Sequence, residues 1–305
     1  MEGFHVYRID TSSHEIKVTQ IRKVLSKMKL KRLLRRSFCE VSWLLKGKKE
    51  FIKVRRQGLI WELGSQNCID RAIIRIGAWE EKSTQLVRKF VEPGMHILDV
   101  GANIGYFTTI FAQLVGPTGK VWAFEPVGHF RKRIYRLLEL NNLLSQSLVN
   151  DYGLSDREQE VDITIAAASA TIHPVSSGES SVPTEVIRLK RLDDVYSGLG
   201  IKRCDLIKVD IDGHEPFFIE GARQFLRKYQ PVIMIEFAQN HLYIANRDVL
   251  SLRQQLENFG YTLYSERTGK PFSSTSDFLV ECGNFTHSAN VWAYPSDSPV
   301  NMPRI

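Results

Sequence analysis

Two acid-rich segments stand out because each places carboxyl side chains directly after a short apolar run. Residues 97–105 read Ile-Leu-Asp-Val-Gly-Ala-Asn-Ile-Gly, and residues 206–215 read Leu-Ile-Lys-Val-Asp-Ile-Asp-Gly-His-Glu. An apolar strand followed by a glycine turn and a helix is the usual nucleotide-binding arrangement of doubly wound α/β folds. Ligands in such folds bind outside the carboxyl ends of the strands, so we expect both segments at one site.

The glycine segment favours S-adenosyl-L-methionine (SAM) over a dinucleotide. A dinucleotide fingerprint needs G-x-G-x-x-G, but Asn103 stands where the second glycine would be, and Tyr106 follows Gly105. Asp99, two residues before Gly101, would repel a phosphate. The same acid suits SAM, which carries an ammonium group and no phosphate. An NAD-dependent oxidoreductase remains the alternative.

Further acids follow the next two apolar runs. Glu125 comes 24 residues after Gly101, close to the spacing of about 20 residues at which doubly wound sites place the acid that binds the ribose. A carboxylate can accept hydrogen bonds from both ribose hydroxyls. Asn150-Asp151 closes the third strand, and Asp151 could accept from an adenine amino group, although a turn-forming aspartate explains it almost as well.

The second acid-rich segment has the residue types that deprotonate an alcohol. Methyl transfer requires alignment of the acceptor with the methyl group and removal of the acceptor's proton. His214 has a suitable pKa range for a general base, and Asp210 or Glu215 could orient it or act as the base. The alternative is that this stretch caps the following helix. Asp210, Asp212, Glu215 and Glu236 could also hold magnesium, but no fixed ligand spacing supports this.

Taken together, these motifs resemble the FkbM methyltransferase family. Its members pair an I-L-D-V-G-A-N-I-G-type loop with a K-I-D-V-E-G-H-E-type segment, and this chain carries both, at residues 97–105 and 208–215. The second segment differs conservatively, with Val209, Ile211 and Asp212. The resemblance covers roughly residues 51–237, and three shorter matches add to it: Phe124-Glu125-Pro126, Gly153-Leu154-Ser155-Asp156 and Ile235-Glu236-Phe237.

The resemblance implies a class I methyltransferase fold, an α/β Rossmann-like three-layer sandwich. Its sheet would be seven-stranded and mostly parallel, with an antiparallel closing strand. It also implies SAM as cofactor and O-methylation of a hydroxyl on a small molecule, sugar or glycan. The residues implied at the cofactor are Asp99, Gly101, Asn103 and Gly105 along SAM, Glu125 at the ribose and Asp151 at the adenine edge.

Gly77-Ala78-Trp79-Glu80 also fits the family pattern. It implies that Trp79 covers the cofactor and that Glu80 faces its methionine end. Core packing for Trp79 and a helix start for Glu80 are equally good explanations.

Strands and helices that alternate along the chain must position these residues. Apolar runs of strand length occupy residues 96–100, 121–124, 148–152, 205–209 and 232–237, and segments of helical length occupy residues 106–115, 129–144 and 215–229. This order predicts a mostly parallel sheet with helices on both faces. Upstream, we expect a hairpin over residues 51–60 and helices over 70–76 and 80–91.

Three regions depart from this alternation. Residues 160–190 predict an inserted antiparallel hairpin near the rim of the site, its strands (161–166 and 186–189) joined by the Ser/Pro/Gly-rich residues 174–183. Residues 261–264 and 278–281 look like a closing strand pair, and the chain from residue 286 looks irregular. We therefore expect three parts: a basic helical extension with a hairpin (1–75), a SAM-binding methyltransferase domain (76–283) and an irregular tail (284–305).

Positive charge is concentrated near the N-terminus. The 305 residues carry a net charge of +7, and residues 17–56 hold 15 Lys/Arg against two Glu. This segment could contact an anionic surface, although a solvated basic face also explains it. Nucleic acid is not favoured as a partner, because aromatic residues are not interleaved with these charges in the way a base-stacking platform requires, and no N-P-P-Y motif follows the fourth strand.

The remaining features of the sequence limit the class of protein less strictly. No apolar run reaches the roughly 20 residues of a membrane span, and the four cysteines form no C-x-x-C pair. We therefore expect a cytoplasmic enzyme whose acceptor and oligomeric state cannot be read from the sequence. A non-catalytic SAM-binding module is a further alternative, but such a module would not need the acids that follow Val209.

Overall fold

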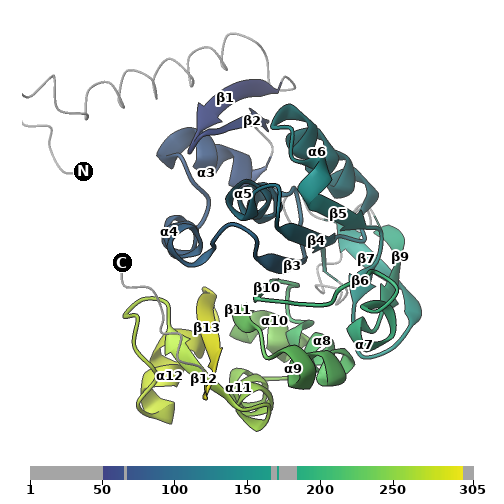
Figure 1. Cartoon of the computed structure of the whole chain (residues 1–305). Coiled ribbons are helices and arrows are strands. Elements are labelled where there is room, and N and C mark those ends of the chain that lie inside the picture. The colour runs from purple at the N-terminus through teal and green to yellow at the C-terminus, as the bar shows by residue number, and fades with distance from the viewer. Residues whose placement is uncertain (1–50, 65–66, 166–169, 172–183, 298–305) are drawn as a thin grey trace, which may run out of the picture. The chain divides into compact units, whose positions relative to one another are not determined.

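The computed structural model describes residues 51–64, 67–165, 170–171 and 184–297 (Figure 1). The basic helical stretch expected before residue 51 and the loop expected at residues 174–183 lie outside these ranges. The described residues belong, from Lys53 onward, to one compact unit.

A seven-stranded sheet forms the centre of this unit (Figure 1). Its strands run, from edge to edge, in the order β12 (Tyr261–Ser265), β13 (Ala289–Pro295), β11 (Val232–Phe237), β10 (Leu206–Val209), β3 (His96–Val100), β4 (Lys120–Phe124) and β5 (Ser147–Asn150). The strands from β11 to β5 are parallel to one another, whereas β13 is antiparallel to both of its neighbours. The predicted mostly parallel sheet with one antiparallel strand is confirmed.

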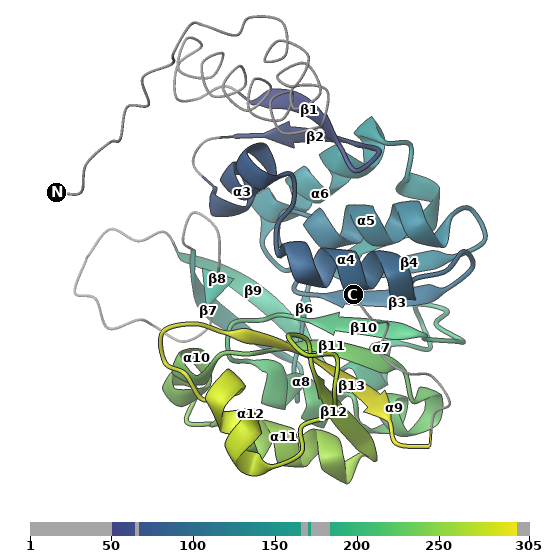
Figure 2. The same ribbon diagram turned by 90° about the vertical axis from the view of Figure 1, so that its left-hand side faces the viewer.

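Helices cover both faces of the sheet, which gives the predicted three layers (Figure 2). On one face lie α4 (Glu81–Phe90), α5 (Tyr106–Val115) and α6 (Gly128–Leu140), and on the other α8 (Glu215–Gly221), α9 (Arg223–Tyr229) and α11 (Val249–Asn258). The remaining helical elements of the described residues are α3 (Cys68–Ile76), η1 (Leu144–Gln146), α7 (Leu192–Val195), α10 (Gln239–Ile244) and α12 (Thr275–Cys282).

The central strands are buried from both sides by these helices. Leu98, Ile207 and Ile233 lie side by side on β3, β10 and β11 and are fully buried. A parallel strand covered on both faces reads as a continuous apolar run rather than an alternating one. This is why short apolar runs were sufficient to predict these strands.

A hairpin precedes the sheet, as predicted: β1 (Ile52–Arg56) pairs with β2 (Leu59–Leu63). The Asn141 side chain, at the end of α6, accepts from the Ile60 amide (2.7 Å) and donates to the Ile60 carbonyl (2.8 Å). The nearly buried Asp70 carboxylate of α3 pairs with Arg133 of α6 at 2.9 Å. From Lys53 onward, the hairpin and α3 therefore lie in the same compact unit as the sheet.

The inserted hairpin is also confirmed. A four-stranded sheet has the order β6 (Gly153–Leu154), β9 (Thr184–Lys190), β7 (Gln159–Ile165) and β8 (Ala170–Thr171). β7 and β9 are antiparallel, with Val161 opposite Ile187. This small sheet lies beside the carboxyl end of β4 and contributes apolar side chains to the site described below.

The closing strand pair was predicted wrongly. Residues 278–281 lie in helix α12, which begins where the Ser274 side chain accepts a hydrogen bond from the Asp277 amide at 3.0 Å. The true partner of β12 is β13, within the tail that was expected to be irregular. β13 has the buried run Val291-Trp292-Ala293-Tyr294, and the Asn, Ser and Pro residues around it obscured this run.

The helix expected over residues 215–229 is split into α8 and α9 at Ala222. Gly221 lies against the backbone of Ser155, and a β-carbon at this position would be 1.8 Å from the Ser155 carbonyl oxygen. The backbone just after β6 therefore occupies the space that a side chain at position 221 would need.

Gly221→Ala should destabilise the protein because neither backbone segment can move freely away from the added methyl group. We expect the free energy of unfolding in urea to fall by about 2 kcal/mol or more. Gly198→Ala is the matched control, because its β-carbon would meet only ordinary van der Waals contact at 3.6 Å. That control should change stability by less than about 1 kcal/mol. Equal stability of the two variants would contradict the proposed close contact.

Candidate cofactor-binding and active site

The glycine turn after β3 lies where the strand order reverses, between β3 and β10. Gly101 has φ of +81°, and a β-carbon there would be 1.9 Å from the Asp210 carbonyl oxygen. Only glycine therefore allows the two loops after β3 and β10 to come so close. Open α/β sheets bind their ligands at such a switch point, outside the carboxyl ends of the strands.

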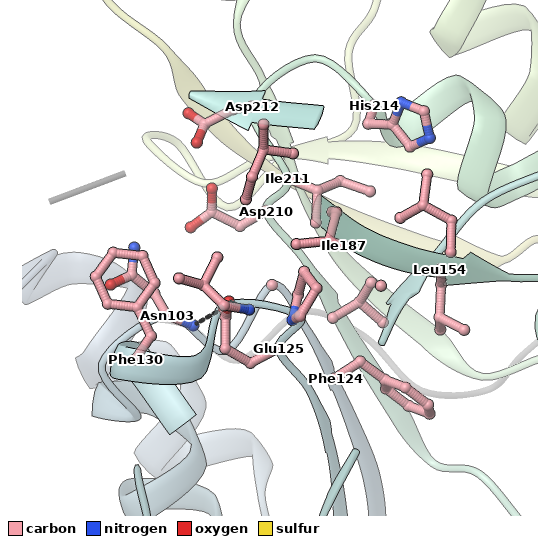
Figure 3. Close-up of a pocket in the computed structure, with 17 residues that line it drawn as sticks. Asn103, Phe124, Glu125, Phe130, Leu154, Ile187, Asp210, Ile211, Asp212 and His214 are labelled. Carbon is pink, nitrogen blue, oxygen red and sulfur yellow. Dashed lines mark hydrogen bonds between the residues drawn. The ribbon is translucent and has the colours of Figure 1, made fainter. Parts of the chain in front are cut away.

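Glu125 follows β4 and is held beside the glycine turn (Figure 3). One carboxylate oxygen accepts from the Asn103 amide and the other from the Val127 amide, both at 2.8 Å. The side chain is 5% exposed. Burial raises the pKa of Glu125 to about 8, against the opposing effect of these two backbone donors. The carboxyl group is thus rigidly oriented and still borders the pocket.

An apolar pocket surrounds Glu125 (Figure 3). Phe124, Phe130 and Leu154 line it from β4, α6 and β6, and Ile187 lines it from β9 of the inserted hairpin. The inserted hairpin therefore forms part of the wall of this pocket. The pocket is suited to a flat apolar group bound next to a hydrogen-bonding carboxyl group.

A second pocket, on the other side of the glycine turn, is rich in charge. It is lined by Glu80, Asp99, Lys208 and Asp210. Trp79 before α4, the first residues of α5 and the glycine turn also line it. Gly101, Asn103, Asp210 and Asp212 border both pockets. The two pockets therefore adjoin at the carboxyl ends of β3 and β10.

Lys208 is the centre of this charged group. Its ammonium group is buried, donates to an Asp210 carboxylate oxygen at 2.9 Å and lies 5.1 Å from the centre of the Phe107 ring. Burial favours the neutral amine, but Asp210, Asp99 and Glu80 together hold the pKa of Lys208 above its usual value. The lysine therefore remains charged.

Asp99 and Glu80 border the charged pocket from two different elements, β3 and the start of α4. Asp99 on β3 is fully buried and accepts from the Thr108 hydroxyl at 2.5 Å; burial raises its pKa, against the lowering effect of Lys208. Glu80 precedes α4 and accepts from the Asn290 amide group on β13 at 2.7 Å. Burial and the charge of Asp210 raise the pKa of Glu80 to about 7.

The three residues predicted to be catalytic have different surroundings. Asp210 is partly exposed and borders both pockets. The His214 ring points away from Asp210 and Asp212 (Figure 3), with Nε2 2.8 Å from the Ser155 hydroxyl and the ring stacked on Phe217. Glu215 is buried; one carboxylate oxygen accepts from the Ile211 amide at 2.9 Å, and burial raises its pKa to about 8. Only Asp210 thus faces the charged pocket.

Asp151, predicted at the adenine edge, lies in a different environment from the other predicted residues. Its carboxylate pairs with Arg188 on β9, about half of the aspartate side chain is exposed, and it borders neither of the two pockets.

Lys208 and His241 were not singled out from the sequence. A lysine inside an otherwise apolar strand was a usable signal for Lys208. No spacing pointed to His241, on α10, whose Nδ1 lies 3.4 Å from an Asp212 carboxylate oxygen.

The strand order, the antiparallel β13 and the acid-flanked glycine turn define a class I methyltransferase fold. A family model described as "Methyltransferase FkbM domain" matches residues 99–263, which is more than half of the chain. The chain belongs to the FkbM methyltransferase family.

Individual relatives are more distant. The AMB antimetabolite synthetase AmbE of Pseudomonas aeruginosa is 30% identical in an alignment of 159 residues that covers 40% of this chain and 7% of AmbE. The 2-O-methyltransferase NoeI of Sinorhizobium fredii is 25% identical over 190 residues, 57% of this chain and 76% of NoeI. A solved FkbM methyltransferase from Methylobacillus flagellatus has a TM-score of 0.43 and 15% identity, covering 74% of this chain and 52% of that one.

S-adenosylmethionine fits the residues at the two pockets. The apolar pocket with Glu125 suits an adenosine, and the charged pocket offers both signs of charge to an amino acid group. Asp99 provides a buried carboxylate oxygen, Oδ1, that makes no hydrogen bond within the described part of the chain.

No helix in the described ranges is long and apolar enough to cross a membrane.

Removing the titration of Glu125 should change how stability depends on pH. The folded pKa of about 8 lies above the ordinary 4.5, so its contribution is fully present below pH 4.5 and is lost as the pH rises towards 8. Relative to Glu125→Gln, the wild type should lose up to about 1.4 kcal/mol per pH unit across this window. Urea unfolding at pH 5, 6, 7 and 8 measures the difference. Parallel profiles would show that burial does not raise this pKa.

Proposed function

We propose that the protein transfers a methyl group from SAM to a hydroxyl group of a small molecule, sugar or glycan. The observation that carries this proposal is the pair of adjoining pockets, one apolar and one charged, which share Gly101, Asn103, Asp210 and Asp212. SAM has the same division, because an adenosine and a zwitterionic amino acid are joined at its sulfonium.

The apolar pocket would hold the adenosine. Glu125 accepts the ribose hydroxyls with the lone pairs that its two backbone donors leave free. Phe124, Phe130 and Leu154 bury the adenine. Since Asp151 is paired with Arg188, the adenine edge would depend on this apolar enclosure more than on that carboxylate.

The charged pocket would hold the methionine part. Lys208 attracts its carboxylate, while Glu80 and Asp99 attract its ammonium group. Burial strengthens each of these attractions, because the local dielectric constant is low. Gly105, predicted to line SAM, follows the same turn and opens α5.

The acceptor would approach beside Asp210, which borders both pockets. When bound, SAM supplies a methyl group already activated by its sulfonium. The protein must then orient the acceptor oxygen and accept its proton. We assign the proton acceptor to Asp210, with His214 and Glu215 as positioning residues that fix the loop after β10. The similarity to NoeI, a protein named as a 2-O-methyltransferase, supports oxygen as the methylated atom.

Calorimetric titration with SAM and with S-adenosylhomocysteine tests the cofactor assignment. Both should bind, and Asp99→Asn and Glu125→Gln should each weaken binding at least about tenfold, because each replaces a carboxyl oxygen with an amide nitrogen that cannot accept a hydrogen bond. The exposed Glu158→Gln is the matched control and should bind as the wild type does. A wild type that binds neither ligand would overturn the assignment.

Turnover on a panel of hydroxylated small molecules and saccharides, followed as S-adenosylhomocysteine formed, tests the proton acceptor. Asp210→Asn should lower kcat at least about 100-fold while SAM affinity changes less than tenfold. His214→Gln should keep kcat within about tenfold, because its ring bonds Ser155 and borders the apolar pocket rather than the charged one. The opposite result would make His214 the base.

A further inference from the structure

Three side chains that can bind a metal converge beside the charged pocket. Asp212 lies in the loop after β10, Glu236 near the end of β11, and His241 on α10. Each offers one ligand atom, and these atoms all lie within 4.8 Å of one another. Ligands at about 2.1 Å from a metal lie up to roughly 4 Å from each other. The three groups therefore need only small side-chain adjustments to share one ion.

The backbone holds these three residues together. Gly213 packs so closely on α10 that a β-carbon would be 2.7 Å from the His241 carbonyl group. This contact places His241 next to Asp212, whose own φ is +52°. Glu236 enters from the side because β10 and β11 are parallel neighbours, with Val209 opposite Ile235. The cluster thus depends on fixed elements rather than on one loop.

The charges and lone pairs around this cluster favour a cation. Asp212 and Glu236 both border the charged pocket, and Asp210 adds a third carboxylate there. Lys208 is already paired with Asp210 at 2.9 Å. Within the described residues, the buried Nδ1 atom of His241 makes no hydrogen bond, although it lies 3.4 Å from an Asp212 oxygen. An imidazole nitrogen and two carboxylates are donors of the kind that bind a divalent transition-metal ion.

We propose that Asp212, Glu236 and His241 bind one divalent transition-metal ion, such as Mn²⁺, at the acceptor side of the methyl-donor pocket. The mixed nitrogen and oxygen donors suit Mn²⁺ better than Mg²⁺, which prefers oxygen ligands and keeps its waters. Three protein ligands leave positions open for acceptor oxygens, as in catalytic metal sites. An acceptor with two neighbouring oxygens, such as a vicinal diol, would occupy two of them.

The role of this ion rests on the proposed methyl transfer. An acceptor hydroxyl bound to the metal loses its proton more readily, and the Asp210 carboxylate takes that proton. The acceptor oxygen then forms a bond with the methyl carbon. The bond from this carbon to sulfur breaks, its electron pair stays on sulfur, and the products are the methyl ether and S-adenosylhomocysteine.

Titration of the full chain with Mn²⁺ alone, followed by the electron paramagnetic resonance signal of the free ion, tests the site without any turnover. It is done with S-adenosylhomocysteine present and absent. We expect one Mn²⁺ per chain, with binding weakened at least about tenfold in Asp212→Asn, Glu236→Gln and His241→Ala. His96→Ala is the matched histidine control, because His96 opens β3 at the opposite end of the sheet, and it should bind Mn²⁺ normally.

Three outcomes would overturn the metal site: no Mn²⁺ bound by the wild type, Mn²⁺ bound equally well by all three variants, or loss of binding in His96→Ala to the same extent. Circular dichroism melting and S-adenosylhomocysteine affinity show that each variant is folded. If the cofactor binds and Mn²⁺ does not, this inference fails while the proposed methyltransferase function stands. If Mn²⁺ binds and the cofactor does not, only the proposed function fails.

Discussion

The buried ammonium group of Lys208 is the interaction on which the charged half of the site depends. Burying several carboxylates together is strongly unfavourable unless a positive charge compensates them. Lys208 pairs with Asp210 directly and also lowers the pKa of Asp99 and Glu80. β10 is the neighbour of β3 in the sheet, and Lys208 is the one charged residue of β10. Its side chain therefore lies at the switch point between these two strands. Strand order and charge balance therefore determine the pocket together.

Most of the fold could be predicted from the sequence because its central strands are buried on both faces. Such strands read as short apolar runs, and β3, β11 and α5 have the predicted bounds. The sequence misled where an apolar run was not a strand: Phe278–Val280 belongs to a capped helix. The break between α8 and α9 was not predicted either; beside it, Gly221 makes a tertiary contact with the Ser155 backbone that no local sequence pattern reveals.

The candidate site was predictable to the extent that its residues lie at the end of a strand. Asp99 near the end of β3 and Glu125 after β4 border the two pockets, as their positions in the sequence indicated, whereas Glu80 was indicated only by the family resemblance. Arg188 gives Asp151 a partner that could not be foreseen, because it comes from the inserted hairpin. The directions of the side chains could not be predicted from the sequence either. The stretch from Asp210 to Glu215 looks like one cluster in the sequence, yet His214 and Asp210 face different surroundings in the structure (Figure 3).

The position of β13 has a consequence for how the protein is made on the ribosome. β13 is translated after β11 and β12, yet it lies between them and supplies Asn290 to Glu80. Until β13 emerges, β11 and β12 have unpaired edges that can bind other nascent chains. The methionine end of the pocket also lacks one of its supporting side chains during that time. Synthesis from N- to C-terminus thus delays a complete site until the antiparallel strand has been inserted.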